Sequence, residues 1–348
     1  MKIVVDKLIP FIEQPIQKIT NQVVFVSGDE FTPKLIKDAD ALIIRTRTHC
    51  NANSLKGSNV KFIATATIGF DHIDTDYCKQ AGITWCNAPG CNANAVAQYV
   101  QSSLLVWAKT KRLRLKGLTM GIIGVGNVGH KVAKIAEGFG MRVLLNDPPR
   151  MEKEGYLGFT PLDILTQESD IVSFHVPLTM EGQYKTYHMA NHTFLDSLKK
   201  KPLLINTSRG EVTDTTALLN ALREHLISDV VLDVWENEPH INTTLAQLAF
   251  ICTPHIAGYS MEGKANATAM ALEQLCHFFK IKADYSINLP APPKINIKST
   301  NNEDILLTIY NPLMDSEKLK HHPDLFEQYR NNYPLRREAQ AYNLSRLQ

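Results

Sequence analysis

The amino-acid sequence predicts an α/β protein with two doubly wound parallel sheets and a small α+β segment at its C-terminus. Three observations support this prediction. Short apolar runs alternate with helical patterns, a glycine-rich turn at 124–129 separates a strand from a helix, and a proline-rich break at 286–293 precedes the last residues. A chain of 348 residues has room for two or three domains, so each sheet is expected to have its own core.

The first sheet is expected in the N-terminal part of the chain, where apolar runs are short and bounded by polar or turn residues. The predicted strands are 2–5, 23–26, 41–44 and 61–64. A long helix is predicted at 93–113 because apolar residues recur there at helical spacing. A second long helix, 261–280, is expected to return the chain to the first unit.

The second sheet is expected between these two helices, where buried runs again alternate with helical patterns. Its predicted strands are 119–123, 142–145, 171–174, 203–206, 230–234 and 249–252.

The charge balance and the cysteines narrow the class of protein. The chain has 37 basic and 35 acidic residues, a formal net charge of +2, which gives no indication of a nucleic-acid surface. No apolar stretch approaches the ~20 residues of a membrane span, and the first apolar run is too short for a signal peptide. Six cysteines without a Cys-x-x-Cys pair favour reduced thiols in a cytoplasmic protein without disulfides or a metal site.

The segment Gly124-Val125-Gly126-Asn127-Val128-Gly129 has the pattern of a dinucleotide-binding turn. Gly124 permits the tight turn, Gly126 allows the backbone to approach a pyrophosphate, and Gly129 lets the helix pack against the strand. The free N–H groups at the helix start favour phosphate charge. The alternative is a flexible surface loop, but strand, glycines, helix and second strand follow one another in the order that a Rossmann-type cofactor site requires.

Asp147 follows the second strand of this unit and is the expected acceptor for the ribose hydroxyls. A carboxylate there favours NAD, because it repels the 2′-phosphate of NADP. Arg150 lies three residues further on, beyond a predicted turn at Pro148-Pro149, and would weaken this preference only if it pointed toward the ribose.

Three polar segments follow three buried strands, at 206–210, 233–239 and 253–258. The carboxyl ends of parallel strands form the ligand edge of an open sheet, so these segments are expected to converge. His255 is the candidate base for a hydroxyl proton, with Glu238 as the carboxylate that orients it. Arg209 is suited to hold a substrate carboxylate and to polarise the C2 oxygen. Singly, each residue is better explained by structure alone, but the three together, each after its own strand, favour catalysis.

The order and spacing of five motifs over about residues 1–285 resemble the D-isomer-specific 2-hydroxyacid dehydrogenases. The motifs are the glycine turn, His175-x-Pro177-Leu178, Asn206-x-x-Arg209-Gly210, Asp233-Val234-x-x-x-Glu238-Pro239 and Pro254-His255-x-x-Gly258. The resemblance implies that Arg209, Glu238 and His255 are catalytic and that NAD is the cofactor. It also implies cofactor contacts by further residues, namely Gly124, Gly126, Asn127, Val128, Gly129, Asp147, Val176, Thr207, Asp233 and Gly258.

The family resemblance also implies a domain arrangement. We expect a discontinuous substrate-binding domain, 1–93 and 256–288, and an NAD-binding Rossmann domain, 94–255, with the two long helices as hinges. Residues 289–348 are expected to form a C-terminal dimerisation domain, so a homodimer is predicted. Periodicity alone does not decide between a small third domain and a partly disordered tail for this segment.

A narrower resemblance concerns the substrate. The segments 64–72, 88–93, 146–150 and 255–259 are similar to a subgroup that oxidises a four-carbon phosphorylated hydroxy acid for pyridoxine 5′-phosphate biosynthesis and carries an extra C-terminal domain. This implies substrate contacts at Thr46, Thr67 and Tyr259. The run 45–48 supplies hydroxyl and guanidinium groups suited to a phosphate, with Arg45 as the first candidate.

Two other functions remain as alternatives. The acid could be 3-phosphoglycerate or D-lactate, which other members of the family oxidise. The protein could also be a non-catalytic corepressor that senses NADH with the same fold. Turnover on the candidate acids distinguishes all three.

Overall fold

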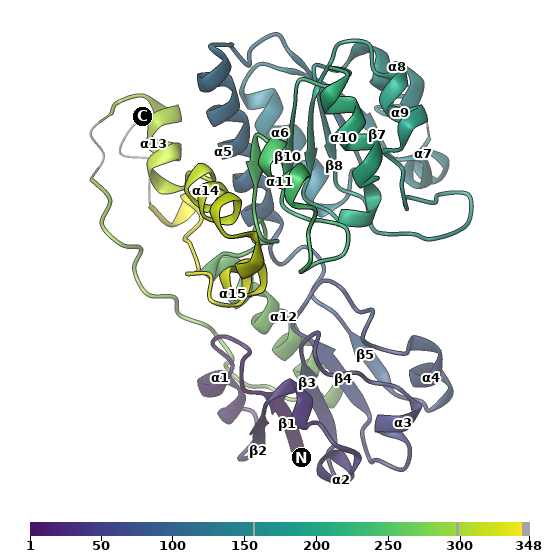
Figure 1. Ribbon diagram of the computed structural model, residues 1–348. Helices are drawn as coiled ribbons and strands as arrows, with labels where there is room; N and C mark the ends of the chain where they lie inside the picture. The colour runs from purple at the N-terminus through teal and green to yellow at the C-terminus, as the bar shows by residue number, and fades with distance from the viewer. Residues whose placement is uncertain (156, 297–298, 343–348) are drawn as a thin grey trace. The chain divides into compact units, whose positions relative to one another are not determined.

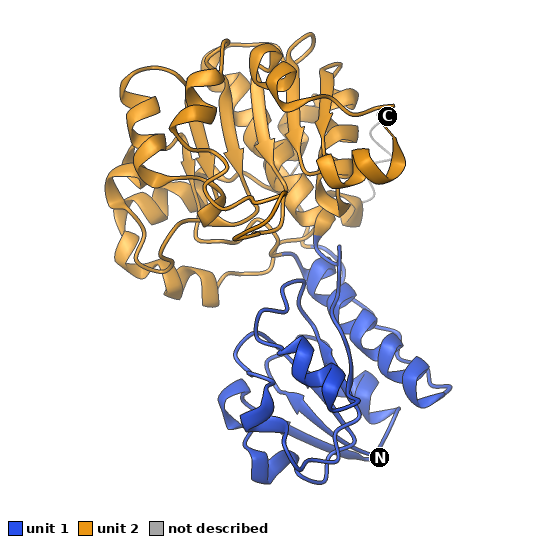
Figure 2. Ribbon diagram, turned by 90° about the vertical axis from the view of Figure 1, so that its right-hand side faces the viewer, with its two compact units in different colours: residues 1–92, 260–292 blue, residues 93–259, 293–348 orange. Residues whose placement is uncertain are grey.

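The computed structural model describes residues 1–155, 157–296 and 299–342 (Figure 1). The chain divides into two compact units: unit 1 is Met1–Asn92 with Ser260–Pro292, and unit 2 is Ala93–Tyr259 with Pro293–Gln348 (Figure 2). Unit 2 includes most of the segment predicted as a separate C-terminal domain, of which 297–298 and 343–348 lie outside the described residues. The expected assignment of functional domains stays a prediction.

Unit 1 is built on a five-stranded parallel sheet in the order β2-β1-β3-β4-β5. Its strands are β1 Lys2–Asp6, β2 Gln22–Val26, β3 Ala41–Ile44, β4 Phe62–Thr65 and β5 Thr84–Cys86. The four predicted strands are present. The sequence did not predict β5, because its three residues are exposed or half-buried and give no apolar run.

Helices cover both faces of this sheet. They are α1 Glu13–Gln17, α2 Pro33–Ile36, α3 Ala52–Leu55, α4 Thr75–Gln80 and α12 Met261–Phe279. The long helix α12 begins where the Ser260 side chain accepts the Gly263 N–H and ends at Lys280 in a left-handed conformation. Its residues Leu272 and Leu275 are fully buried against the sheet, which confirms that this helix returns the chain to the first unit.

Unit 2 is built on a six-stranded parallel sheet in the order β11-β10-β9-β8-β6-β7. Its strands are β6 Thr119–Ile123, β7 Arg142–Asn146, β8 Ile171–Phe174, β9 Leu203–Asn206, β10 Asp229–Leu232 and β11 Ile251–Cys252. The strand order reverses between β6 and β8, and such a switch point is where doubly wound sheets bind ligands. Both predicted doubly wound sheets are therefore confirmed.

Helices also cover both faces of the second sheet (Figure 1). They are α5 Ala93–Lys111, α6 Asn127–Gly138, α7 Pro148–Glu154, α8 Leu162–Glu168, α9 His192–Ser197, α10 Thr215–Arg223 and α11 Thr243–Leu248. One apolar core joins α5 and α6 to the sheet, and a second joins α8 to α11 to its other face. The predicted turn at Pro148-Pro149 is wrong, because these prolines open α7. The backbone N–H groups of the first turn of a helix have no partner within the helix, so proline loses no hydrogen bond there.

The C-terminal residues pack on unit 2, at the β11 edge of its sheet and against α5. They form α13 Asn302–Ile309, α14 Leu313–His321, α15 Phe326–Asn331 and the 3-10 helices Pro323–Leu325 and Ala339–Tyr342. The backbone N–H of Cys252 in β11 donates to the Ser316 hydroxyl of α14 over 2.9 Å, and Leu319 and Phe326 complete the adjoining core. The α+β character predicted for this segment is not confirmed, since its described residues form helices and no strand.

Among the residues that the structure describes, no helix is both long and apolar enough to cross a membrane.

Candidate active site

Three neighbouring strands bring the predicted catalytic segments to one edge of the unit 2 sheet. Leu232, the last residue of β10, lies in register with Asn206 at the end of β9 and with Cys252 at the end of β11. Arg209 follows β9 by three residues, and His255 follows β11 by three. The expected convergence at the carboxyl ends of these strands is therefore a feature of the sheet itself.

The side chains of His255 and Glu238 form a hydrogen bond. The distance from Nδ1 of His255 to Oε2 of Glu238 is 2.8 Å, and the other carboxylate oxygen accepts the backbone N–H of Trp235 over 3.0 Å. Burial by itself would raise the pKa of Glu238, but the hydrogen bond and the charges of His255 and Arg330 lower it below its ordinary value. Glu238 is thus held as a carboxylate beside the imidazole.

The backbone at His255 has a left-handed conformation, with φ of 57°, which a residue with a Cβ adopts only when its surroundings enforce it. Asp233 provides that enforcement. Its carboxylate accepts the N–H groups of Ile256 and Ala257, each over 2.8 Å, and the hydroxyl of Thr253 over 2.6 Å. Burial raises the pKa of Asp233. Its contacts are with the loop, so its expected contact with the cofactor stays a prediction.

Arg209 is placed by the turn that follows β9. The amide of Asn206 donates to the Arg209 carbonyl over 2.9 Å and accepts from Ser208, which fixes the shape of this turn. The Arg209 side chain is half-buried, and its guanidinium donates to the Ser208 carbonyl over 2.7 Å. No acidic side chain in the described part of the chain pairs with it, so its fork of donors is available to a carboxylate.

Gly210 explains how closely the Arg209 turn approaches the segment that carries Glu238. A Cβ atom at Gly210 would lie 1.9 Å from the backbone carbon of Trp235 and 2.5 Å from the nitrogen of Glu236. Only glycine permits this approach. The indole of Trp235 also donates to the Thr253 carbonyl over 2.9 Å, so all three predicted segments are in contact in one layer.

The glycine turn between β6 and α6 has the geometry of a cofactor cradle. Gly124 has φ of 88°, and a Cβ there would lie 2.6 Å from the His175 carbonyl oxygen. A Cβ at Gly129 would lie 2.0 Å from the Gly124 oxygen, so the helix and strand touch there. At Gly126, however, a Cβ would meet no protein atom within 4 Å. This open position at the start of α6 is where a pyrophosphate approaches in such folds.

Asp147 and Arg150 are placed by the start of α7. The Asp147 carboxylate accepts the N–H of Val125 over 2.8 Å and the N–H of Arg150 over 3.2 Å, which ties the glycine turn to the end of β7. The Arg150 guanidinium pairs with Glu154 over 2.6 Å and donates to the Val125 carbonyl. Arg150 is therefore engaged within the protein, and the NAD preference expected from Asp147 stays a prediction.

The remaining predicted cofactor residues follow β8, β9 and β11 or open α6. Val176 follows β8, and its side chain would contact a Cβ at Gly124 at 2.8 Å. The hydroxyl of Thr207 lies 3.5 Å from Nδ1 of His175, and burial lowers the pKa of His175 to about 3, so this histidine is neutral. Asn127 and Val128 open α6, and Gly258 lies in the loop after His255.

The candidate substrate residues of unit 1 follow two paired strands. Ile44 and Thr65, at the ends of β3 and β4, are in register, so Arg45, Thr46 and Thr67 share one edge of the sheet. The Arg45 guanidinium donates to the Leu8 carbonyl over 2.9 Å, Thr46 is exposed, and the Thr67 hydroxyl contacts Thr65 over 2.7 Å and Gly69 over 2.9 Å. The fourth candidate, Tyr259, lies in unit 2.

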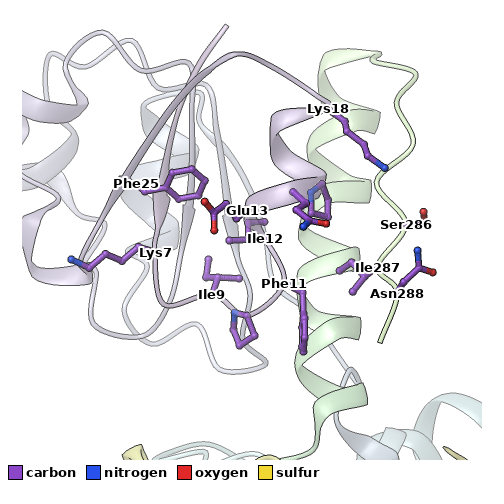
Figure 3. A pocket seen from close by; sticks show the side chains of 13 residues that line it. Lys7, Ile9, Phe11, Ile12, Glu13, Lys18, Phe25, Ser286, Ile287 and Asn288 are labelled. Atoms are coloured by element: carbon purple, nitrogen blue, oxygen red, sulfur yellow. The ribbon is translucent and has the colours of Figure 1, made fainter. Parts of the chain in front are cut away.

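A separate pocket of about 730 Å³ lies in unit 1, between α1 and the segment 286–288 (Figure 3). Lys7, Lys18 and Glu13 provide its charged groups. None of the predicted site residues lines this pocket, so it is separate from the site described above. No group of three or more metal-binding side chains occurs within the described ranges.

The sequence did not identify three C-terminal residues that contact this site. Arg330 lies 3.4 Å from Glu238, Arg336 donates to the loop after His255, and the rings of Tyr333 and Tyr259 meet edge to face. Periodicity and spacing do not indicate such contacts, because the two residues of each contact are 74 to 92 positions apart in the chain (333 − 259 and 330 − 238).

Comparisons with known proteins agree with this geometry. Residues 92–257 match the family model "D-isomer specific 2-hydroxyacid dehydrogenase, NAD binding domain". The cofactor-bound 3-phosphoglycerate dehydrogenase of Entamoeba histolytica superposes with a TM-score of 0.66 and 30% identity, covering 83% of this chain and 99% of that one. The fold and the site thus define an NAD-dependent 2-hydroxyacid dehydrogenase.

Two relatives cover nearly the whole chain. An erythronate-4-phosphate dehydrogenase of Bacteroides thetaiotaomicron is 59% identical over 344 residues, 99% of each chain. Another, of Porphyromonas gingivalis, is 41% identical and covers 99% of this chain and 95% of its own. The chain belongs to the family of erythronate-4-phosphate dehydrogenases.

Proposed function

We propose that this protein oxidises the C2 hydroxyl of 4-phospho-D-erythronate to (R)-3-hydroxy-2-oxo-4-phosphooxybutanoate in pyridoxine 5′-phosphate biosynthesis. The observation that carries the proposal is the 2.8 Å hydrogen bond between His255 and Glu238 at the ligand edge of an NAD-binding sheet. The substrate is inferred from relatives that bear its name and match almost the full chain.

His255 is the proposed base. Its Nε2 takes the proton of the C2 hydroxyl while the C2–H bond breaks and the carbonyl forms. Glu238 accepts from Nδ1 and stabilises the imidazolium that results. In the reverse direction the same imidazolium returns the proton to the carbonyl oxygen.

Arg209 is the proposed partner of the substrate carboxylate. A planar guanidinium binds a carboxylate through two parallel hydrogen bonds and lies close enough to polarise the C2 oxygen. Its half-buried side chain and the close packing of Gly210 on Trp235 support a fixed position.

The proposed cofactor residues are those around the glycine turn. NAD, when bound there, supplies the acceptor for the C2 hydride. The N–H groups at the start of α6 and the open space at Gly126 are suited to its pyrophosphate, and Asp147 to its ribose hydroxyls. Asn127, Val128, Val176, Thr207, Asp233 and Gly258 complete the proposed set.

The proposed substrate contacts beyond Arg209 are Thr46, Thr67, Tyr259 and Arg45. Arg45 and Thr46 follow β3 and offer a cation and a hydroxyl, which is the chemistry that a phosphate monoester requires. Thr67 follows the neighbouring strand β4. We further propose that the protein is a cytoplasmic homodimer, and that 289–348 contributes to the dimer as the family resemblance implies.

The test is a side-by-side assay of NADH formation with 4-phosphoerythronate, unphosphorylated erythronate, 3-phosphoglycerate and D-lactate. The highest kcat/KM is expected with 4-phosphoerythronate. Faster turnover of 3-phosphoglycerate or D-lactate would overturn the proposed substrate. Tight NADH binding with no turnover of any acid would favour a sensor instead of an enzyme.

A further inference from the structure

The C-terminal segment contributes a cation to the His255–Glu238 pair. Nη1 of Arg330, in α15, lies 3.4 Å from Oε2 of Glu238, the same oxygen that accepts from His255. The Arg330 side chain is 34% exposed, whereas that of Glu238 is 18% exposed. Oε2 of Glu238 therefore has two neighbours, the imidazole of His255 and the guanidinium of Arg330. Arg330 comes from the C-terminal segment, which lies outside the six-stranded sheet.

A second arginine of the same segment holds the loop after His255. Nη1 of Arg336 donates to the carbonyls of Ile256 over 3.0 Å and Tyr259 over 2.9 Å. Nη2 donates to the carbonyl of Ala95 over 3.0 Å and to that of Ala257. A single guanidinium thus joins most of this loop to the start of α5.

Aromatic side chains keep Arg336 in place. The Tyr310 ring lies 4.2 Å from its guanidinium carbon, a cation–π contact. Asp315 accepts the hydroxyls of Tyr333 over 3.0 Å and Tyr310 over 3.4 Å. The Tyr333 ring in turn meets the ring of Tyr259 at 6.2 Å between centroids. The segment is consequently built to hold the loop from several directions.

We propose that Arg330 and Arg336 are positioning residues for the reaction proposed above. Arg336 fixes the loop between His255 and Tyr259, and Arg330 fixes the Glu238 carboxylate against the imidazole. The inference rests on the proposed function and adds to it a role for the C-terminal segment within the same chain. Neither arginine is assigned a contact with the substrate.

The charge of Arg330 also affects the pH range of activity. The groups that face the pair are Arg330 and the Trp235 N–H at Glu238, and Asp233 at His255. A cation beside a carboxylate favours its ionised form and lowers its pKa, as for Glu238 here. Removing the guanidinium of Arg330 therefore lets the His255–Glu238 pair take up a proton at higher pH. The acid limb of the kcat/KM profile then shifts to higher pH.

The first experiment compares Arg330→Met, Arg330→Lys and the control Arg142→Gln in the full-length chain. Arg142 forms an exposed pair with Glu168 in the same unit, away from the site. Arg330→Met is expected to lower kcat about two- to fivefold and to raise the acid limb by about 0.3–0.7 pH units. Arg330→Lys is expected to keep the acid limb at its wild-type pH. Arg142→Gln is expected to change neither kcat nor the acid limb.

The second experiment uses Arg336→Lys, which keeps the charge but loses the planar fork. A loss in kcat of about 10- to 100-fold with unchanged NADH affinity is expected, because the base is misplaced while the glycine turn is intact. Thermal melts of each variant identify any failure to fold, and the Arg330 series tests the inference independently of Arg336.

Two outcomes separate the inference from the proposed function. A wild-type protein that turns over 4-phosphoerythronate, with an Arg330→Met variant of identical kcat and pH profile, overturns the positioning role alone. A wild-type protein that turns over none of the acids overturns the proposed function and this role with it.

Discussion

Nδ1 of His255 lies 2.8 Å from Oε2 of Glu238, although the two residues follow different strands. The contact exists because β10 and β11 are parallel neighbours whose ends are in register. The buried Asp233 then holds His255 in its left-handed conformation.

Replacing His255 by alanine removes the proposed base. Turnover of 4-phosphoerythronate is expected to fall by about 10²- to 10⁴-fold, the usual contribution of a positioned base. NADH affinity, measured by fluorescence titration, is expected to stay within about twofold, because the glycine turn is unchanged. The control is His192→Ala at an exposed position in α9. Wild-type turnover in His255→Ala would refute the assignment of the base.

Replacing Glu238 by glutamine removes the charge that faces the imidazole. A hydrogen bond to a charged group contributes about 1.5–3 kcal/mol, so kcat is expected to fall about 10- to 150-fold. The change also bears on stability. Because the pKa of Glu238 is lowered on folding, its carboxylate stabilises the native state above its ordinary value of 4.5 and loses this effect as the pH falls through the native pKa.

Urea unfolding of wild type and Glu238→Gln at several pH values measures this linkage. The difference in the free energy of unfolding is expected to be largest near neutral pH and to shrink below pH 4.5, the ordinary value of the carboxyl group. A difference that stays constant, or grows in acid, contradicts the lowered pKa of Glu238.

Replacing Gly126 by alanine tests the cofactor cradle without disturbing the fold. The added Cβ meets no protein atom within 4 Å and the backbone φ of −77° suits alanine, so thermal stability is expected to be unchanged. NADH affinity is expected to fall about tenfold or more, because the methyl group enters the space for the pyrophosphate.

Gly138→Ala is the matched control for that substitution. It lies at the exposed end of the same helix, and its Cβ would also meet nothing within 4 Å. The control is expected to retain NADH affinity and to gain up to about 1 kcal/mol in stability. Equal NADH affinities in both variants would show that the space at Gly126 is not used by the cofactor.

Replacing Arg209 by lysine keeps the charge but removes bidentate binding. The kcat/KM for 4-phosphoerythronate is expected to fall about 10- to 150-fold, since a charged hydrogen bond contributes about 1.5–3 kcal/mol. Arg223→Lys, an exposed position in α10, is the control and is expected to keep wild-type kinetics. An Arg209→Lys variant with an unchanged kcat/KM would exclude a two-point contact.

The C-terminal segment shows where prediction from the sequence stopped. Two of the motifs that resemble the family contain Glu238 and His255, but nothing in the spacing of Arg330 or Arg336 relates them to that pair. In the same way, β5 escaped prediction because three residues in a half-exposed edge give no apolar pattern. Local sequence does not encode contacts that close loops of 70 residues or more (333 − 259 is 74).

The sequence by itself determined the two parallel sheets, the glycine turn and the three polar segments that end β9, β10 and β11. These follow from apolar periodicity, from glycine at positions that exclude a side chain, and from the rule that parallel strands share a carboxyl edge. Only the tertiary structure decided that α15 and the residues after it lie against that edge. Burial of Leu319 and Phe326 in the unit 2 core, rather than any local pattern, brings Arg330 to Glu238.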